Sequence, residues 1–133
     1  MIYVDSSVVL AQLLAEDRYP DAHFWDAGPL ISSRLLEHEV WTRINARGLG
    51  PSLAEDVRLL LARLAFLELV PPVLARALEP FAKPVRTLDA LHLSTALVLR
   101  ERRAQDIAFA THDAQQATAA RALGFQVVGV KGA

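Results

Sequence analysis

The sequence contains no cysteine, which excludes disulfide bonds, thiolate metal ligands and cysteine nucleophiles. This absence is compatible with a reducing cytoplasm. Lysine is scarce too, because only Lys83 and Lys131 occur and arginine supplies the remaining positive charge. The formal net charge is -1 at pH 7, so the chain lacks the basic balance of a protein that coats a nucleic-acid duplex. A small acidic site between arginines remains compatible with this charge.

No stretch of the sequence reaches the roughly 18 apolar residues of a membrane-spanning helix. The first residues, Met1 to Asp5, also lack the basic start and long apolar stretch of a secretory signal peptide. We therefore expect a cytoplasmic protein without a membrane segment. Hydrophobic residues make up 53% of the 133 residues, which predicts a single folded domain over 1–133 rather than a disordered chain.

Short apolar runs alternate along the chain with longer amphipathic segments. The clearest helix is predicted over 87–103, because several arginines fall in its last turn, where the helix dipole favours cations. Since the apolar runs are short and uninterrupted, they predict a mostly parallel sheet with helices on both faces, a three-layer α/β/α sandwich. The predicted strands are 2–4, 30–32, 66–70, 106–110 and 125–130.

Polar residues mark the places where helices are expected to begin. Ser6 or Ser7 follows the first apolar run and can cap the next helix. Ser52, with Glu55 three residues later, matches a capping box, and Thr87 can cap the long helix. These residues predict three helix starts.

Two carboxylates are expected at the carboxyl ends of strands. Asp5 ends the first apolar run, and Asp113 lies just beyond the run at 106–110. In open α/β sheets, ligand sites form beyond the carboxyl ends of the strands, so both acids fall at the same kind of position. Asp89 lies in the first turn of the long helix, and Glu39 lies at the edge of the apolar stripe of an earlier helix.

Each acid also has a structural interpretation. Asp113 can be a helix N-cap, Asp89 can complement a helix dipole, and Glu39 can be a solvated surface residue. Asp5 is harder to explain in this way, because an acid at the end of an apolar strand must be solvated, capped or bound to a cation. From the residues alone, both interpretations stay open.

Four motifs that contain these acids resemble the PIN-domain family, and more narrowly the VapC-type toxins of bacterial toxin–antitoxin pairs. The motifs occur in the family order, and Asp5, Glu39, Asp89 and Asp113 fall at the positions of the family's acidic residues. The motifs are IYVDSS at 2–7, SSRLLEHEV at 32–40, RTLDALHLSTA at 86–96, and FATHD at 109–113 followed by ARALGF at 120–125.

The resemblance implies a Mg²⁺- or Mn²⁺-dependent endoribonuclease, the toxin of a type II toxin–antitoxin pair. It implies that the acidic cluster holds the metal and that a metal-activated water hydrolyses the RNA phosphodiester. It further implies a homodimer, a cognate antitoxin protein and a transfer or ribosomal RNA as substrate. The implied catalytic residues and metal ligands are Asp5, Glu39, Asp89 and Asp113.

Five neighbours of the acids are candidates for supporting roles. By the resemblance, Ser6 and Thr111 orient ligands or water, although Ser6 can equally be a helix cap. Arg34 and Arg86 flank the motifs and are candidates for binding substrate phosphate, although isolated arginines are commonly ordinary surface residues. His92 follows Asp89 by three residues on one helix face, and we expect it to be structural or to support a ligand.

Three alternatives remain open. A Mg²⁺-dependent phosphotransfer or phosphatase domain also places an Asp after its first strand. Dehalogenase-type enzymes want a second Asp two residues later, however, and Ser7 occupies that position. A nuclease-dead binding module is less compatible with the presence of all four acids. A PIN nuclease of RNA maturation, without a toxin role, would carry the same site.

Overall fold

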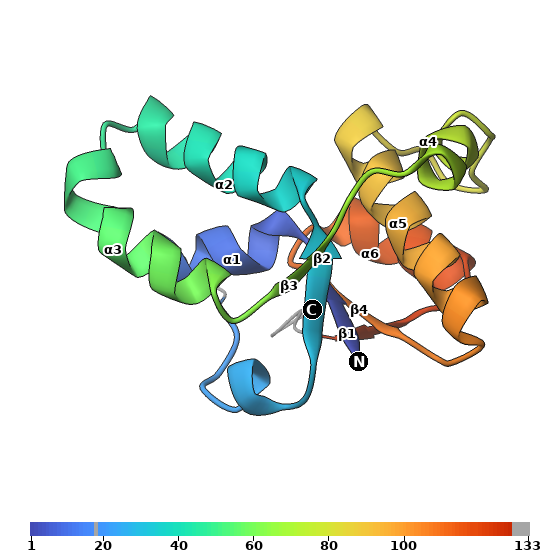
Figure 1. The fold of residues 1–133 in the computed structure, drawn as a ribbon, viewed down its shortest axis with the longest axis horizontal. Helices are drawn as coiled ribbons and strands as arrows, with labels where there is room; N and C mark the ends of the chain where they lie inside the picture. The colour runs from blue at the N-terminus through green and yellow to red at the C-terminus, as the bar shows by residue number, and fades with distance from the viewer. Residues whose placement is uncertain (18, 129–133) are drawn as a thin grey trace.

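A parallel sheet forms the centre of the computed structural model, which describes residues 1–17 and 19–128 (Figure 1). Within the described residues the sheet has five strands in the order β3-β2-β1-β4-β5, and neighbouring strands are parallel. β1 lies in the middle, where Tyr3 pairs with Ile31 of β2 and Phe109 of β4. The strands are β1 (Ile2–Val4), β2 (Leu30–Ser33), β3 (Ala65–Leu67), β4 (Ala108–Ala110) and β5 (Gln126–Val128).

Helices cover both faces of the sheet, which confirms the predicted three-layer α/β/α sandwich. One layer contains α1 (Ser6–Leu13), α2 (Leu35–Ala46) and α3 (Gly50–Leu61), drawn at the left of Figure 1. The other contains α4 (Pro71–Ala77), α5 (Thr87–Arg103) and α6 (Ala114–Ala122), drawn at the right. A 3₁₀ turn, η1 (Phe24–Asp26), lies in the connection between α1 and β2. Among the described residues, no helix is long and apolar enough to cross a membrane.

Each face of the sheet has its own hydrophobic core, because successive side chains of a strand point to opposite faces. Val4 and Ala110 pack with the α1–α3 layer. Tyr3 and Phe109, their neighbours in the same strands, pack with α5 and α6. Double burial explains why the strand segments are uninterruptedly apolar and why the sequence predicts a parallel sheet.

The apolar stripe of α2 sets the position of Glu39. Leu36, Val40 and Ile44 recur every four residues and are fully buried against the α1–α3 side of the sheet. Glu39 precedes Val40 and therefore lies at the edge of this stripe, where it is partly buried. The sequence prediction of this helix and of its buried face is confirmed.

The predicted helix caps are wrong at two helices. The N-cap of α1 is Asp5, whose side chain accepts a hydrogen bond from the backbone N–H of Ser7, so neither Ser6 nor Ser7 is the cap. The N-cap position of α5 is held by Arg86 without a side-chain cap hydrogen bond, and Thr87 is the first helical residue. At α1 the Asp5 carboxylate takes the cap position, because Asp5 directly follows β1 and Ser6 is already the first helical residue.

Prolines lie in the first turns of α3 and α4. α3 begins at Gly50 with Pro51 in its first turn, and Ser52 donates to the carbonyl of Leu49, so the predicted capping box is wrong. Pro71 begins α4, because a proline at the first helical position is preorganised for the helix and lacks only an N–H that would be unpaired. Residues 129 and 130 of the last predicted strand lie outside the described residues.

Candidate acidic active site

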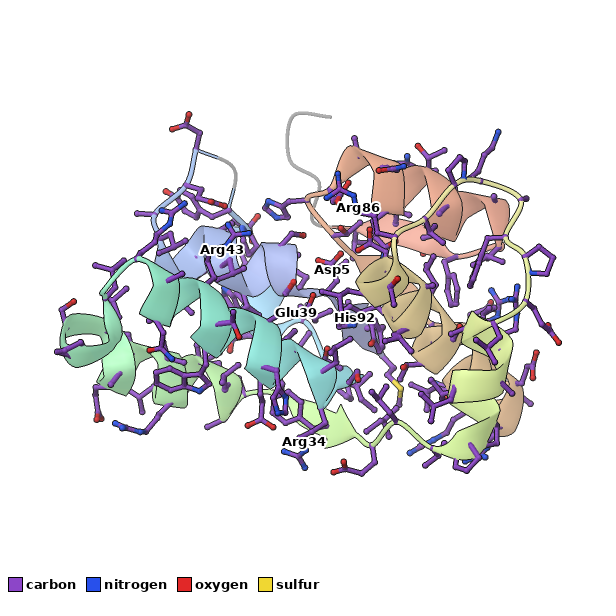
Figure 2. The ribbon with its side chains drawn as sticks, turned by 90° about the horizontal axis from the view of Figure 1, so that it is seen from above. Asp5, Arg34, Glu39, Arg43, Arg86 and His92 are labelled. Carbon is purple, nitrogen blue, oxygen red and sulfur yellow. The ribbon has the colours of Figure 1, made fainter. Side chains whose placement is uncertain are left out.

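Three of the predicted acids meet at the carboxyl end of the sheet. Asp5 follows β1 and caps α1, while Asp113 follows β4 and caps α6; β1 and β4 are hydrogen-bonded neighbours. Asp89 lies in the first turn of α5. Glu39 reaches the same region from α2, in the opposite helix layer, and Figure 2 shows Asp5, Glu39 and His92 near the middle of the view from above.

Asp5 is the most deeply buried of these acids, with 4% of its surface exposed. Burial raises the pKa of its carboxyl to about 6, against opposing hydrogen bonds from Ser7 and Thr111 and the charge of His92. The Ser7 backbone N–H donates to Asp5 Oδ1 at 3.0 Å, and the Ser7 hydroxyl donates to the same oxygen at 2.5 Å. A charged carboxylate is therefore held in a site that favours its neutral form.

We expect Asp5→Asn to stabilise the metal-free protein at neutral pH. Because the folded-state pKa of Asp5 lies above its unfolded value, the carboxyl favours folding most below pH ~4, and this contribution is lost as the pH rises to ~6. Asparagine caps helices as well as aspartate and carries no charge. Urea unfolding in chelator should give the variant a gain of about 1–3 kcal/mol at pH 7.5 that shrinks at pH 4.5. A variant less stable than the wild type at pH 7.5 would contradict the electrostatic cost assigned to Asp5.

Hydroxyl groups tie the two strand ends together. Ser7 Oγ lies 3.3 Å from Thr111 Oγ1 and accepts a hydrogen bond from the backbone N–H of His112 at 2.8 Å. Thr111 Oγ1 accepts from the backbone N–H of Asp113 at 3.1 Å. Thr111 thus contacts the backbone of Asp113 and lies beside the Ser7 hydroxyl that donates to Asp5, and its role in orienting ligands or water stays a prediction. Among the described contacts of Asp5, the supporting serine is Ser7 and not Ser6, and the adjacent serines of the motif gave no signal to separate them.

Asp113 is the N-cap of α6, and it uses one of its two carboxylate oxygens for this role. Its Oδ1 accepts the backbone N–H groups of Gln115 at 2.9 Å and Gln116 at 3.3 Å, as a helix N-cap does. Its Oδ2 makes no hydrogen bond to the described part of the chain. The cap therefore fixes the orientation of the carboxylate and leaves one oxygen available for a ligand.

Electrostatic interactions connect Asp89 to the other acids. The pKa of Asp89 is raised, first by burial and then by repulsion from Asp113 and Glu39, while His92 and Arg86 act in the opposite direction. Carboxylates from three separate motifs thus sense one another's charge. Such repulsion is what a bound cation would relieve.

Glu39 is held by a histidine from the opposite helix layer. His92 Nε2 lies 2.5 Å from Glu39 Oε1, and His92 Nδ1 lies 2.7 Å from the hydroxyl of Tyr3. The His92 side chain is 1% exposed and that of Glu39 is 16% exposed. The sequence indicates a supporting role for His92 but gives no sign that its partners are Glu39 and Tyr3.

The two predicted arginines differ in their surroundings. Arg34 forms ion pairs with Glu37 at 2.6 Å and Glu68 at 3.0 Å, so its charge is already matched by two carboxylates. Arg86 is exposed, makes no ion pair with a described residue, and lowers the pKa of Asp89. Sequence reasoning missed Arg43, which follows Glu39 by one helical turn and lies at the same end of the molecule (Figure 2).

The donor set of this site fits a hard divalent cation. No group of three or more His, Asp or Glu side chains among residues 1–17 and 19–128 is placed so that it could hold a metal ion. Mg²⁺ does not require such a group, because it usually binds one or two carboxylates and keeps several waters. Carboxylate oxygens are its preferred protein ligands. Asp113 has one oxygen without a hydrogen bond to the described residues, and the pKa of Asp89 is raised by burial and by neighbouring carboxylates. Both features agree with such a site.

The chain is similar to known proteins in both sequence and structure. The family model of the PIN domain matches residues 2–122 of the chain. Ribonuclease VapC47 of Mycobacterium tuberculosis (strain CDC 1551 / Oshkosh) is 29% identical over 130 residues, which cover 94% of this chain and 93% of that protein. A chain of a solved toxin-antitoxin complex from Klebsiella pneumoniae has the same fold, with a TM-score of 0.66, 16% identity and 96% coverage of both chains.

Proposed function

The chain belongs to the PIN-domain family, and we propose that it is a divalent-metal-dependent endoribonuclease that acts as the toxin of a type II toxin–antitoxin pair. The observation that carries the proposal is that acids from separate motifs interact at one end of the sheet, with Asp113 and Glu39 both raising the pKa of Asp89. Similarity to a ribonuclease along nearly the whole chain and to a toxin–antitoxin complex in fold supports the toxin role.

We assign the direct metal contacts to Asp5 and Asp113, with Asp89 and Glu39 completing the site around Mg²⁺ or Mn²⁺. When bound, the cation supplies an acidified water and offsets charge that develops on the phosphate. The protein contributes by holding the carboxylate oxygens of Asp5 and Asp113 in fixed orientations. The cap hydrogen bonds of Asp113 and the Ser7 contacts of Asp5 fix both carboxylates before any ligand arrives.

RNA phosphates approach an acidic site only if cations lie beside it. We assign this role to Arg86 and Arg43, which make no ion pair with a described residue. In the view of Figure 2, Arg43 lies to the left of Asp5 and Arg86 lies above it, and guanidinium groups bind phosphate with two parallel hydrogen bonds. Arg34 is less suited, because Glu37 and Glu68 already occupy it.

Removing Arg86 or Arg43 should weaken RNA binding more than removing Arg34. The slope of log K against log salt is negative, and each loss of a phosphate contact should reduce its magnitude by about 0.7 for single-stranded RNA. Binding can be measured by fluorescence anisotropy in an Asp5→Asn background, so that the RNA stays intact. Arg34→Ala is the matched control, because its charge is paired with Glu37 and Glu68. Equal effects of all three substitutions would refute this assignment.

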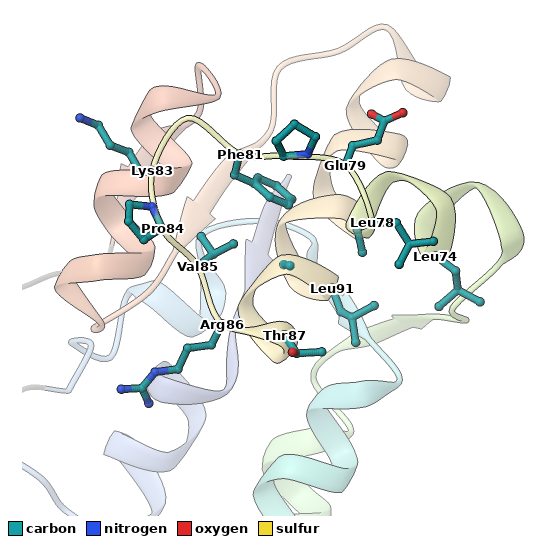
Figure 3. Close-up of a pocket in the computed structure, with 13 residues that line it drawn as sticks. Leu74, Leu78, Glu79, Phe81, Lys83, Pro84, Val85, Arg86, Thr87 and Leu91 are labelled. Carbon is teal, nitrogen blue, oxygen red and sulfur yellow. The ribbon is translucent and has the colours of Figure 1, made fainter.

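We also propose that the protein forms a homodimer through an apolar surface on α4 and the start of α5. Leu78 is 89% exposed, and Leu74 and Leu88 are 45% and 46% exposed, which is unusual for leucine side chains in one region. Leu74 and Leu78 line a groove of about 570 Å³ between α4, the following loop and α5 (Figure 3). Arg86 lies at one end of this groove, so dimerisation would bring a second copy close to the acidic site.

The substitution Leu78→Glu should convert such a dimer into a monomer. A charge placed in an apolar interface is costly to bury, by several kcal/mol. Light scattering coupled to size-exclusion chromatography at micromolar concentration would then give a mass near 14.6 kDa instead of twice that value. Leu59→Glu is the control, since Leu59 is a 61%-exposed leucine on α3. A monomeric wild type, or a dimer that survives Leu78→Glu, would disprove this interface.

The cognate antitoxin is the remaining partner that we propose, on the basis of the named relatives. A small antitoxin gene beside the gene for this chain would favour the toxin role over a role in RNA maturation. Transfer RNA and ribosomal RNA are the substrate classes that we propose for testing first.

A further inference from the structure

Three side chains form a hydrogen-bonded chain from the middle of the sheet to the acidic site. Tyr3, in the central strand, contacts His92 of α5 at 2.7 Å, and His92 contacts Glu39 of α2 at 2.5 Å. Tyr3 is fully buried and His92 is 1% exposed. The chain therefore links the sheet and both helix layers through polar atoms that are largely out of reach of water.

The hydroxyl groups beside Tyr3 donate their hydrogens elsewhere. Ser32 donates its hydroxyl hydrogen to the carbonyl of Val4 at 2.6 Å, and Thr95 donates its own to the carbonyl of Leu91 at 2.7 Å. Neither hydroxyl hydrogen is left for Tyr3. A tyrosine phenol carries one hydroxyl hydrogen, which Tyr3 can donate.

The imidazole has two nitrogens with different roles, and the bond at one nitrogen decides the role of the other. If the Tyr3 hydroxyl donates to Nδ1 of a neutral His92, the ring proton resides on Nε2. Nε2–H then donates to Glu39 Oε1. In this arrangement the side chain of Tyr3 selects the tautomer that is able to hold the carboxylate.

Among the four acids, Glu39 most needs such support. Asp5 and Asp113 are fixed by backbone N–H groups as helix caps, and Asp89 is a short side chain in a first helical turn. Glu39 comes from the middle of α2 on a longer side chain with more rotatable bonds, whose ordering costs more conformational entropy. Among the described residues, the side chain that hydrogen-bonds Glu39 is His92.

We propose that His92 is a positioning residue, which holds Oε1 of Glu39 so that the second carboxylate oxygen faces the metal site, and that Tyr3 sets the tautomer of His92. The inference rests on the proposed metal-dependent function. It assigns a task to a buried histidine that would otherwise be a satisfied core residue. A purely structural histidine would affect the stability of the fold and leave the affinity for metal unchanged.

Mn²⁺ binding to the full-length metal-free protein, measured by calorimetry, separates these roles without relying on activity. We expect His92→Leu to raise the Kd for Mn²⁺ about 10- to 100-fold, as loss of a residue that orients a ligand typically does. His92→Gln keeps an N–H donor for Glu39 and should stay within about threefold of the wild type. Leu99→Ala, a buried change elsewhere on α5, controls for lost stability and should leave the Kd unchanged.

A double-mutant comparison tests whether His92 acts through Glu39. In a Glu39→Gln background, His92→Leu should cause no further loss of Mn²⁺ affinity, because the carboxylate that it holds is gone. Tyr3→Phe should weaken Mn²⁺ binding a few-fold in the wild type and should have no effect in the Glu39→Gln background. If His92→Leu does not fold, Tyr3→Phe alone tests whether the hydrogen-bonded chain affects Mn²⁺ affinity. Unchanged Mn²⁺ affinity in folded His92→Leu, or in Tyr3→Phe, overturns the role of this chain while the nuclease proposal stands. A wild type that binds no Mn²⁺ overturns both.

Discussion

Asp5→Asn should lower the rate of RNA cleavage by at least about 100-fold, because even residues that only orient a metal ligand commonly contribute 10- to 100-fold. Asp5 is central to the site: it is 4% exposed, caps α1 and stands at the end of the central strand. The amide keeps the cap and the shape but removes the charge that attracts a cation. The loss should therefore appear in kcat of a folded protein, measured on a defined RNA at fixed Mn²⁺ concentration.

An exposed acid away from the site provides the matched control. Asp106→Asn makes the same chemical change in the segment before β4, at the opposite end of that strand from Asp113, and should leave the rate unchanged. Circular dichroism and unfolding in chelator would establish that both variants are folded. If Asp5→Asn retains wild-type activity, Asp5 is not a ligand and the site has been assigned wrongly.

Saturating Mg²⁺ or Mn²⁺ should stabilise the protein, whereas chelator should abolish both this gain and the cleavage of RNA. A ligand that binds only the folded state adds about 2.7 kcal/mol at a concentration of 100 times its Kd. The gain should be largest at neutral pH, because the carboxyl of Asp5 must lose its proton and its pKa is raised to about 6. Thermal unfolding at pH 5 and pH 7.5, with metal and with chelator, measures this effect.

Asp5→Asn serves as the control for specific metal binding. This variant should be more stable than the wild type in chelator and should gain little from metal, so the order of stability should reverse when metal is added. Equal stabilisation of both proteins by Mn²⁺ would indicate binding elsewhere on the surface.

The layered fold could be predicted because its signals are local and repeated. The 3.6-residue periodicity of α2 and the helix over Thr87–Arg103 appear in the structure as predicted. Helix starts were less predictable, because several polar residues compete for each cap. Asp5 caps α1 in place of the serines, and α3 begins at Gly50 with Pro51 in its first turn, ahead of Ser52. A sequence lists the candidates for a cap, but the path of the chain out of the strand selects among them.

The candidate acids could be predicted from their place after strands, for Asp5 and Asp113, and from resemblance, for all four, whereas the hydrogen-bond partners of Glu39 could not. The bond between His92 and Glu39 joins residues 53 positions apart, and the bond between Tyr3 and His92 spans 89 positions. No local pattern specifies such contacts; they follow from how the two helix layers meet across the sheet. The pairing of Arg34 with Glu68, 34 positions away, was hidden for the same reason.

The measurement that tests the central claim most directly is cleavage of total cellular RNA by the purified, antitoxin-free protein. The wild type and Asp5→Asn would be compared, each with Mn²⁺ and with chelator, and the fragments would be mapped by sequencing their ends. The account predicts discrete fragments only from the wild type with Mn²⁺, and their ends would identify the RNA. Cleavage that persists in chelator or in Asp5→Asn, or no cleavage by folded, metal-loaded wild type, would contradict it.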